Sequence, residues 1–156
     1  MGKKISQLRK RSNSYVKNLP RTIERVINVD VAEDLKLLQK QQLRASKMPD
    51  GKNITNKQTG RADYHPSYKA WKSRFFSSSY GDGKINLLLK GNLDDRMTIK
   101  ATGMRYRYFT NVPYAAKLIS KYGDFLSGLA PFKQPTAKSI TTRAIAKDYK
   151  SKVFSR

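Results

Sequence analysis

A stripe of apolar residues from Pro20 to about Lys47 repeats with the four-and-three spacing of one helix face, and it sets the scale of any fold that this chain adopts. Proline suits the first turn of a helix because its missing amide hydrogen would have no partner there. Pro49, followed by Asp50 and Gly51, ends the segment. We therefore predict one long helix. Its core-facing residues are Ile23, Ile27, Val31, Leu35, Leu38 and Ala45, with Val26 and Leu37 beside them.

Apolar and polar residues alternate in residues 97–102 and 104–110, on either side of Gly103. This pattern predicts an antiparallel hairpin. Successive side chains of a strand point to opposite faces, so the second strand has one packed face and one basic face. The packed face holds Met104, Tyr106 and Tyr108, and the basic face holds Arg105 and Arg107.

A short helix is predicted over residues 66–76, directly after His65. Tyr68, Trp71 and Phe75 lie three and four residues apart on one face, whereas the basic residues of the segment lie elsewhere. We expect burial of Trp71, the one tryptophan of the chain, to anchor this helix.

The rest of the chain adds short elements and one further long helix. Residues 85–89 are predicted as a short buried piece, and Pro113 begins a helix that ends at Gly123. Residues from about Thr136 to Val153 again have helical spacing. The predicted fold is α+β, with a long N-terminal helix packed on a small antiparallel sheet, a C-terminal helix and flexible basic extensions.

The chain of 156 residues has room for about one core. We expect a basic N-terminal arm at residues 1–19, a core domain at 20–135 and a C-terminal helix at 136–156. The core domain contains a long loop at 48–63, which is rich in Gly, Asn, Thr and Lys. We expect that loop to be mobile or to be ordered by a partner.

Charge points to the partners of the protein. The sequence has 33 Lys and Arg against 11 Asp and Glu, a formal net charge of +22, which implies a polyanionic neighbour or an acidic protein. The first 21 residues contain no carboxylate. They contact nucleic acid or an acidic subunit, or they form a solvated tail that packs on a neighbour. The candidate contacts are Lys3, Lys4, Arg9, Lys10, Arg11, Arg105 and Arg107.

Reactive groups are sparse in the sequence. There is no cysteine, which excludes disulfides and cysteine-based zinc sites. His65 is the only histidine and precedes a proline, and the neighbours Asp94 and Asp95 point apart in any regular element. No apolar stretch reaches the roughly 20 residues that span a bilayer, and no signal peptide is recognisable. We predict a soluble protein that is not an enzyme and has no cofactor, metal, membrane or small-molecule substrate.

The order of several short motifs is more informative than any single one. A glycine-to-tryptophan loop is followed by a leucine-glycine-leucine segment, in which Lys90 stands where a threonine is usual. An asparagine-proline-tyrosine-alanine segment with a later glycine follows the hairpin, and a proline-phenylalanine step precedes the last helix. The residues that carry these motifs are Gly51, Trp71, Leu89, Gly91, Leu93, Pro113, Tyr114, Gly123, Pro131 and Phe132.

From about residue 47 onward, over roughly two thirds of the chain, this order resembles the virion-morphogenesis, tail-completion and head-to-tail connector proteins of tailed bacteriophages. The resemblance implies subunits arranged as a ring around the tail axis, with a structural role in joining the tail to the head. It also implies portal, neck or tail proteins as partners, possible contact with packaged DNA, and a place in the virion after assembly in the host cytoplasm. The basic N-terminal arm is not part of the pattern.

A second hypothesis stays open beside this one. The charge and the alternation of Arg and Tyr at 105–108 are also typical of a nucleic-acid-binding protein of the ribosomal or nucleoid type. Such a protein binds with an affinity that falls steeply with salt, because displaced counterions dominate the electrostatic contribution.

Overall fold

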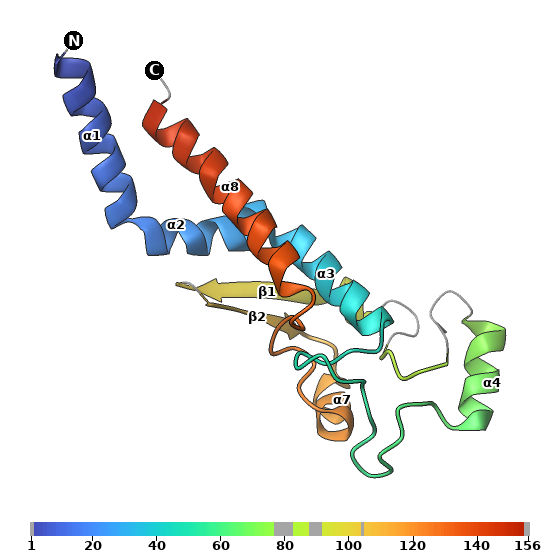
Figure 1. Ribbon diagram of the computed structural model, residues 1–156. Coiled ribbons are helices and arrows are strands. Elements are labelled where there is room, and N and C mark those ends of the chain that lie inside the picture. The colour runs from blue at the N-terminus through green and yellow to red at the C-terminus, as the bar shows by residue number, and fades with distance from the viewer. Residues whose placement is uncertain (1, 77–82, 88–91, 104, 155–156) are drawn as a thin grey trace.

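The computed structural model describes residues 2–76, 83–87, 92–103 and 105–154 (Figure 1). It has the predicted α+β fold. The first part of the chain forms α1 (Gly2–Lys17), α2 (Leu19–Arg25), the π-helix η1 (Val26–Asp30) and α3 (Ala32–Arg44). The rest forms α4 (Pro66–Phe75), α6 (Asn92–Asp95), β1 (Met97–Thr102), β2 (Arg105–Thr110), α7 (Ala115–Tyr122) and α8 (Gln134–Phe154).

The hairpin and the helices of residues 19–44 form the centre of the fold. Strands β1 and β2 pair antiparallel, with Ile99 opposite Tyr108, and α2, η1 and α3 run along the hairpin (Figure 1). The side chain of Tyr108 is fully buried, and its hydroxyl donates a hydrogen bond of 2.8 Å to the carbonyl oxygen of Leu35 in α3. The predicted packing of a long helical segment on a small antiparallel sheet is therefore confirmed.

This helical segment is divided, where the sequence predicts one uninterrupted helix. In η1 the amide of Val31 donates to the carbonyl oxygen of Val26, five residues earlier, at 3.1 Å. A π-turn takes one residue more than an α-turn, so both valines remain on the buried side. Val29 lies between them with 69% of its surface exposed. The apolar stripe thus continues through a change of helix type.

The segment predicted as a basic arm forms α1, which runs antiparallel to α8 (Figure 1). The ring of Tyr15 meets the ring of Tyr149 edge-on, with 5.1 Å between centroids, and its hydroxyl donates to the carbonyl oxygen of Ile145 at 3.3 Å. The hydroxyls of Ser12 and Tyr149 are 3.0 Å apart. Tyr15 is buried but lies outside the main core cluster. A small local contact therefore holds α1 to the molecule.

Two buried amides attach the segment between α7 and α8 to α3. Nε2 of Gln39 donates to the carbonyl oxygen of Phe125 at 2.5 Å. Oε1 of Gln42 accepts from the amide of Ala130 at 2.5 Å, and its Nε2 donates to the carbonyl oxygen of Gly128 at 3.4 Å. Both glutamines are fully buried, and these bonds replace hydration of the Gln42 amide and of Nε2 of Gln39, whereas Oε1 of Gln39 has no hydrogen-bond partner among the described residues. They fix the direction in which the chain enters α8.

The loop at 48–63 is held by the chain itself. Ile54 is fully buried in the core, and the amide of Lys57 donates to the carbonyl oxygen of Lys121, at the end of α7, at 2.9 Å. The amide of Asn56 donates to the carbonyl oxygen of Arg61 at 2.9 Å and closes a turn. The loop was expected to be mobile or ordered by a partner, whereas these contacts attach it to the core and to α7 of the same chain.

Helix α4 buries a lysine and leaves its tryptophan outside. Trp71 is 41% exposed and contacts the rings of Tyr68 and Phe75 on the outer surface, whereas Lys72 has no exposed surface. The prediction that burial of Trp71 anchors this helix is therefore wrong. The physical reason is that the ammonium group of Lys72 finds a buried acceptor in Asn86, so Lys72 takes the inward position.

Candidate functional site

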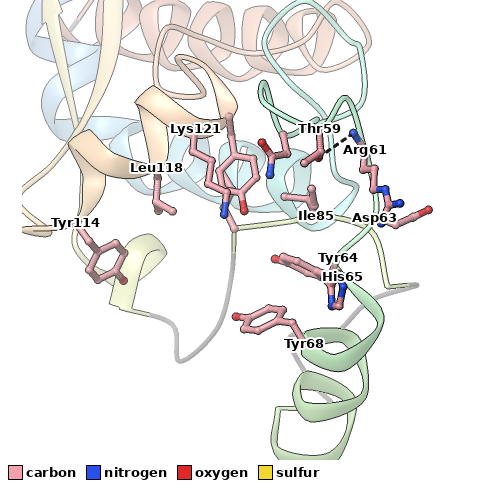
Figure 2. Close-up of a pocket in the computed structure, with 13 residues that line it drawn as sticks. Thr59, Arg61, Asp63, Tyr64, His65, Tyr68, Ile85, Tyr114, Leu118 and Lys121 are labelled. Carbon is pink, nitrogen blue, oxygen red and sulfur yellow. Dashed lines mark hydrogen bonds between the residues drawn. The ribbon is translucent and has the colours of Figure 1, made fainter.

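A pocket of about 600 Å³ lies between the start of α4, the helix α7 and the loop that precedes α4 (Figure 2). Its apolar part is formed by Ile85, Leu87 and Leu118. Ile85 and Leu87 are buried and belong to the main core, so this side of the pocket is backed by tightly packed side chains. The apolar part of the pocket therefore forms together with the core.

Four tyrosines line the same pocket. Tyr64 lies just before α4 and Tyr68 in its first turn, and their rings are 4.9 Å apart between centroids. Tyr114 precedes α7 and approaches from the other side of the pocket (Figure 2), and Tyr122 is the last residue of α7. Tyr68 and Tyr114 are among the exposed large side chains of the protein. A ligand in the pocket would meet aromatic surface on two sides.

Charged side chains surround the opening. Arg61 and Lys121 are exposed and line the pocket together with one acid, Asp63. His65 also lines the pocket, and its Nδ1 lies 2.8 Å from Oγ of Ser67. Two full positive charges against one negative charge give this opening a preference for anions.

A further positive charge lies behind the tyrosines. Nζ of Lys72 donates to Oδ1 of Asn86 at 2.7 Å and to the hydroxyl of Tyr64 at 3.2 Å. Burial lowers the pKa of Lys72 to about 8, and burial raises the pKa of Tyr64 to about 12. At neutral pH the lysine is therefore charged in most molecules and the tyrosine is neutral, so the pair favours negative charge nearby.

The described contacts place no acid-base pair and no metal-ligand group at the pocket. His65 and Asp63 both line the pocket, and in the described part of the chain no hydrogen bond joins them. In those same residues no group of three or more His, Asp or Glu side chains is placed to hold a metal ion. Asp95 lies 3.9 Å from Lys40, and the side chain of Asp94 is outside the described part.

The outer face of the hairpin is a second candidate surface. Arg105 and Arg107 lie on it, exposed as predicted, and Lys100 lies directly opposite Arg107. Like charges opposite one another across two strands repel, and Asp124, 2.6 Å from Arg107, offsets part of this repulsion. Phe109 is exposed on the same face. An anion bound here would relieve the remaining repulsion.

The predicted contacts of the N-terminal segment lie on α1. Lys4, Arg9, Lys10 and Arg11 are all exposed, and Lys3 is described by its backbone alone. Helix α1 packs on α8, whereas the hairpin turn contacts α2 through a hydrogen bond of 3.2 Å from the amide of Gly103 to Glu24. The predicted polyanion contacts are therefore attached to different parts of the fold.

The glycines of the predicted motif set have close neighbours. Gly51 has a φ of +84°, and a Cβ at this position would lie 3.5 Å from the ring of Pro131. Gly123 has a φ of +104°, and a Cβ there would lie 2.9 Å from the end of Met48. The positive φ angles explain why both positions favour glycine, and a side chain at 123 would in addition displace the end of Met48.

The other motif residues are distributed between the core and the surface. Leu93 is buried, and Tyr114 lines the pocket. Trp71, Pro113 and Phe132 are exposed. Leu89 and Gly91 lie outside the described residues.

The pocket itself was not predicted. Tyr114, Leu118 and Tyr122 lie four residues apart within the helix predicted from Pro113 to Gly123, and the spacing of Tyr64 and Tyr68 is also helical. Nothing local in the sequence indicates that these two faces lie across a cavity from one another. The signal that was present is the gathering of tyrosines near the starts of two short helices.

No family model matches the chain, and searches of curated proteins and of solved structures also give no match. No helix in the described ranges combines the length and the apolar composition that a membrane span requires.

Proposed function

We propose that the protein is a structural subunit of a tailed-phage virion, which forms a ring in the neck or at the end of the tail and joins the tail to the head around the DNA channel. The observation that carries the proposal is the pair formed by α1 and α8, which extends beyond the hairpin and places both described chain ends on the same side (Figure 1). An extension of this kind offers surface to a neighbouring subunit.

Apolar side chains on this pair favour a protein contact. Ile5 and Val16 of α1 are 65% and 61% exposed, and Phe154 at the end of α8 is 59% exposed. Large apolar side chains exposed on an extension can become buried when subunits associate. The edge-on contact of Tyr15 and Tyr149 uses only part of the length of α1.

Charge on the same pair supports an acidic neighbour. Helix α1 has six Lys and Arg without a carboxylate, and α8 has five with the single acid Asp148. Two such pairs placed together would repel, so an acidic surface of another virion protein, or the phosphates of DNA, complements them better. This fits a connector that meets the portal or the tail on one side and packaged DNA on the other.

A nucleic-acid-binding protein of the ribosomal or nucleoid type is the second candidate, and the hairpin favours it. Lys100 and Arg105 lie on its outer face with the exposed ring of Phe109. Cations around an aromatic ring are typical of surfaces that bind single strands through phosphates and base stacking.

Mass in solution separates the two candidates. Light scattering of the purified chain is measured at moderate and at high salt, with and without a short DNA duplex. The chain should form a discrete oligomer, either alone or after other virion proteins are added. Val16→Asp should then reduce assembly, and Val29→Asp, at an equally exposed valine in η1, should leave it unchanged. A monomer that binds the duplex tightly and in a salt-sensitive way would replace the connector proposal with the second candidate.

A further inference from the structure

The pocket between α4 and α7 has no part in the proposed ring contact. We propose that it binds a segment of a partner protein in which an aromatic side chain stands beside acidic residues. The inference goes beyond the proposed function, because it concerns a different surface and holds for either candidate function.

The size and the apolar part of the pocket suit an inserted side chain. Binding pockets commonly enclose about 300–1,000 Å³, and this one encloses about 600 Å³. Ile85, Leu87 and Leu118 offer carbon surface without hydrogen-bonding groups. A nucleotide would have to place polar sugar or phosphate groups on part of this surface, whereas an aromatic side chain leaves no polar group there. The apolar part therefore favours a peptide.

The tyrosines also favour a protein ligand. Tyrosine offers a large rigid ring with few rotatable bonds, and it is enriched where proteins recognise other proteins. Tyr68 and Tyr114 are exposed on two sides of the pocket, so their rings are available to an incoming aromatic group (Figure 2). Tyr64 is fixed from behind by its hydrogen bond with Lys72, so its ring is already in place before binding.

The charges select acidic residues beside the aromatic group. Arg61 and Lys121 outnumber Asp63 at the opening, and Lys72 adds a buried positive charge behind Tyr64. Carboxylates of the partner can pair with the exposed cations while the aromatic side chain enters the pocket. The high positive charge of the whole chain also attracts acidic segments from a distance.

The pocket is built by hydrogen bonds within the chain. The amide of Lys57 donates a hydrogen bond of 2.9 Å to the carbonyl oxygen of Lys121. The amide of Asn56 donates one of 2.9 Å to the carbonyl oxygen of Arg61. These two bonds attach the loop with Arg61 to the end of α7, so both cations are held near the apolar part. A preformed site of this kind loses little conformational entropy when it binds.

The test is a titration of the full-length protein with a blocked pentapeptide in which phenylalanine stands between two pairs of acidic residues. Binding is followed by nuclear magnetic resonance shifts of tyrosine and amide signals. Two comparison peptides replace phenylalanine by alanine or the acids by lysine. We expect shifts confined to the pocket with the first peptide and at least about tenfold weaker binding of the other two.

Two charge-reversal variants complete the design. Arg61→Glu should lower the affinity for the acidic peptide about tenfold. Lys100→Glu makes the same change in net charge on the outer face of the hairpin, and it should change this affinity less than twofold. The proposal would be overturned if none of the three peptides shifted signals at the pocket. It would also be overturned if the phenylalanine and alanine peptides bound equally well. Adenosine monophosphate that binds more tightly than the acidic peptide, with the same loss in Arg61→Glu, would overturn it in favour of a nucleotide site.

Discussion

The ammonium group of Lys72 lies 2.7 Å from Oδ1 of Asn86, fully buried, between a helix and an extended segment 14 residues further along the chain. The same group bonds the hydroxyl of Tyr64 at 3.2 Å and lies 4.6 Å from the centre of that ring. One lysine therefore joins α4, the segment at 85–87 and the wall of the pocket. In the described part of the chain none of its hydrogen-bond partners is a carboxylate, so its charge is stabilised only by dipoles and the ring.

Lys72→Met should change how stability depends on pH. Because burial lowers the pKa of Lys72 to about 8, the unfolded chain binds more protons than the folded chain between pH 8 and the ordinary value of 10.5, and wild-type stability rises through this window. The methionine does not titrate, so the free energy of unfolding of the variant relative to wild type should fall by about 2 kcal/mol from pH 7 to pH 9.5. Urea unfolding at the two pH values measures this difference.

The upper limit of pH 9.5 keeps the measurement below the range in which the buried tyrosines contribute. Burial raises the pKa of Tyr64 to about 12, so its ionisation in the unfolded chain begins to lower stability only near pH 10. Lys69→Met, in the same helix, is the matched control. A pH dependence in Lys72→Met equal to that of wild type would show that Lys72 titrates as an exposed lysine.

Gln42→Leu should destabilise the protein by about 2–3 kcal/mol, because the buried amide of Ala130 and the carbonyl of Gly128 lose their partner. Gln41→Leu changes an exposed neighbour that bonds only Lys133, and it should cost less than about 0.5 kcal/mol. Thermal and urea unfolding followed by circular dichroism compare the two. Equal effects would mean that the connection to α8 does not depend on Gln42.

Tyr15→Ala should detach α1 without unfolding the core. The variant loses the ring contact with Tyr149 and the hydrogen bond to Ile145, and the hydroxyl contact between Ser12 and Tyr149 remains. Hydrogen exchange should show faster exchange of the α1 amides and unchanged protection of α3. Val16→Ala, at an exposed position of α1, should leave both segments as in wild type. Loss of protection throughout the protein would show that α1 is part of the cooperative core.

Arg105→Gln should reduce salt-sensitive DNA binding if the outer face of the hairpin contacts phosphates. One cation fewer should lower the slope of log affinity against log salt by about one. Lys117→Gln, an exposed substitution in α7, is the charge-matched control and should leave the slope unchanged. Fluorescence anisotropy with a labelled duplex at several salt concentrations measures both slopes. Equal slopes in the two variants would indicate diffuse attraction without a defined surface.

Elements that depend on local spacing were predictable from the sequence. The alternation on either side of Gly103 predicted β1 and β2, and the spacing after Thr136 predicted α8. Gly123 ends α7 as expected. These predictions succeed because hydrophobic periodicity and turn residues act within a few positions of the chain.

Features that depend on distant residues were not predictable. The inward position of Lys72 requires Asn86, and the pocket requires the faces with Tyr64 and Tyr114 to meet. A prediction from hydrophobicity alone buries Trp71 and exposes Lys72. Such a prediction leaves out the hydrogen bond that the buried lysine gains, and the structure has the opposite arrangement. The predicted surfaces for polyanions followed from charge, and only the fold reveals that α1 and the hairpin are attached to different helices.

The π-turn at η1 also determines where the helical segment can change its length. Val26 and Val31 are five residues apart, and deletion of the exposed Val29 would bring them to the four-residue spacing of an ordinary α-helix with both still facing the core. A deletion elsewhere in α2 or α3 would rotate every later side chain by about 100° around the helix axis. A deletion of one residue is therefore accommodated at η1, and a homologue one residue shorter here would keep the same buried face.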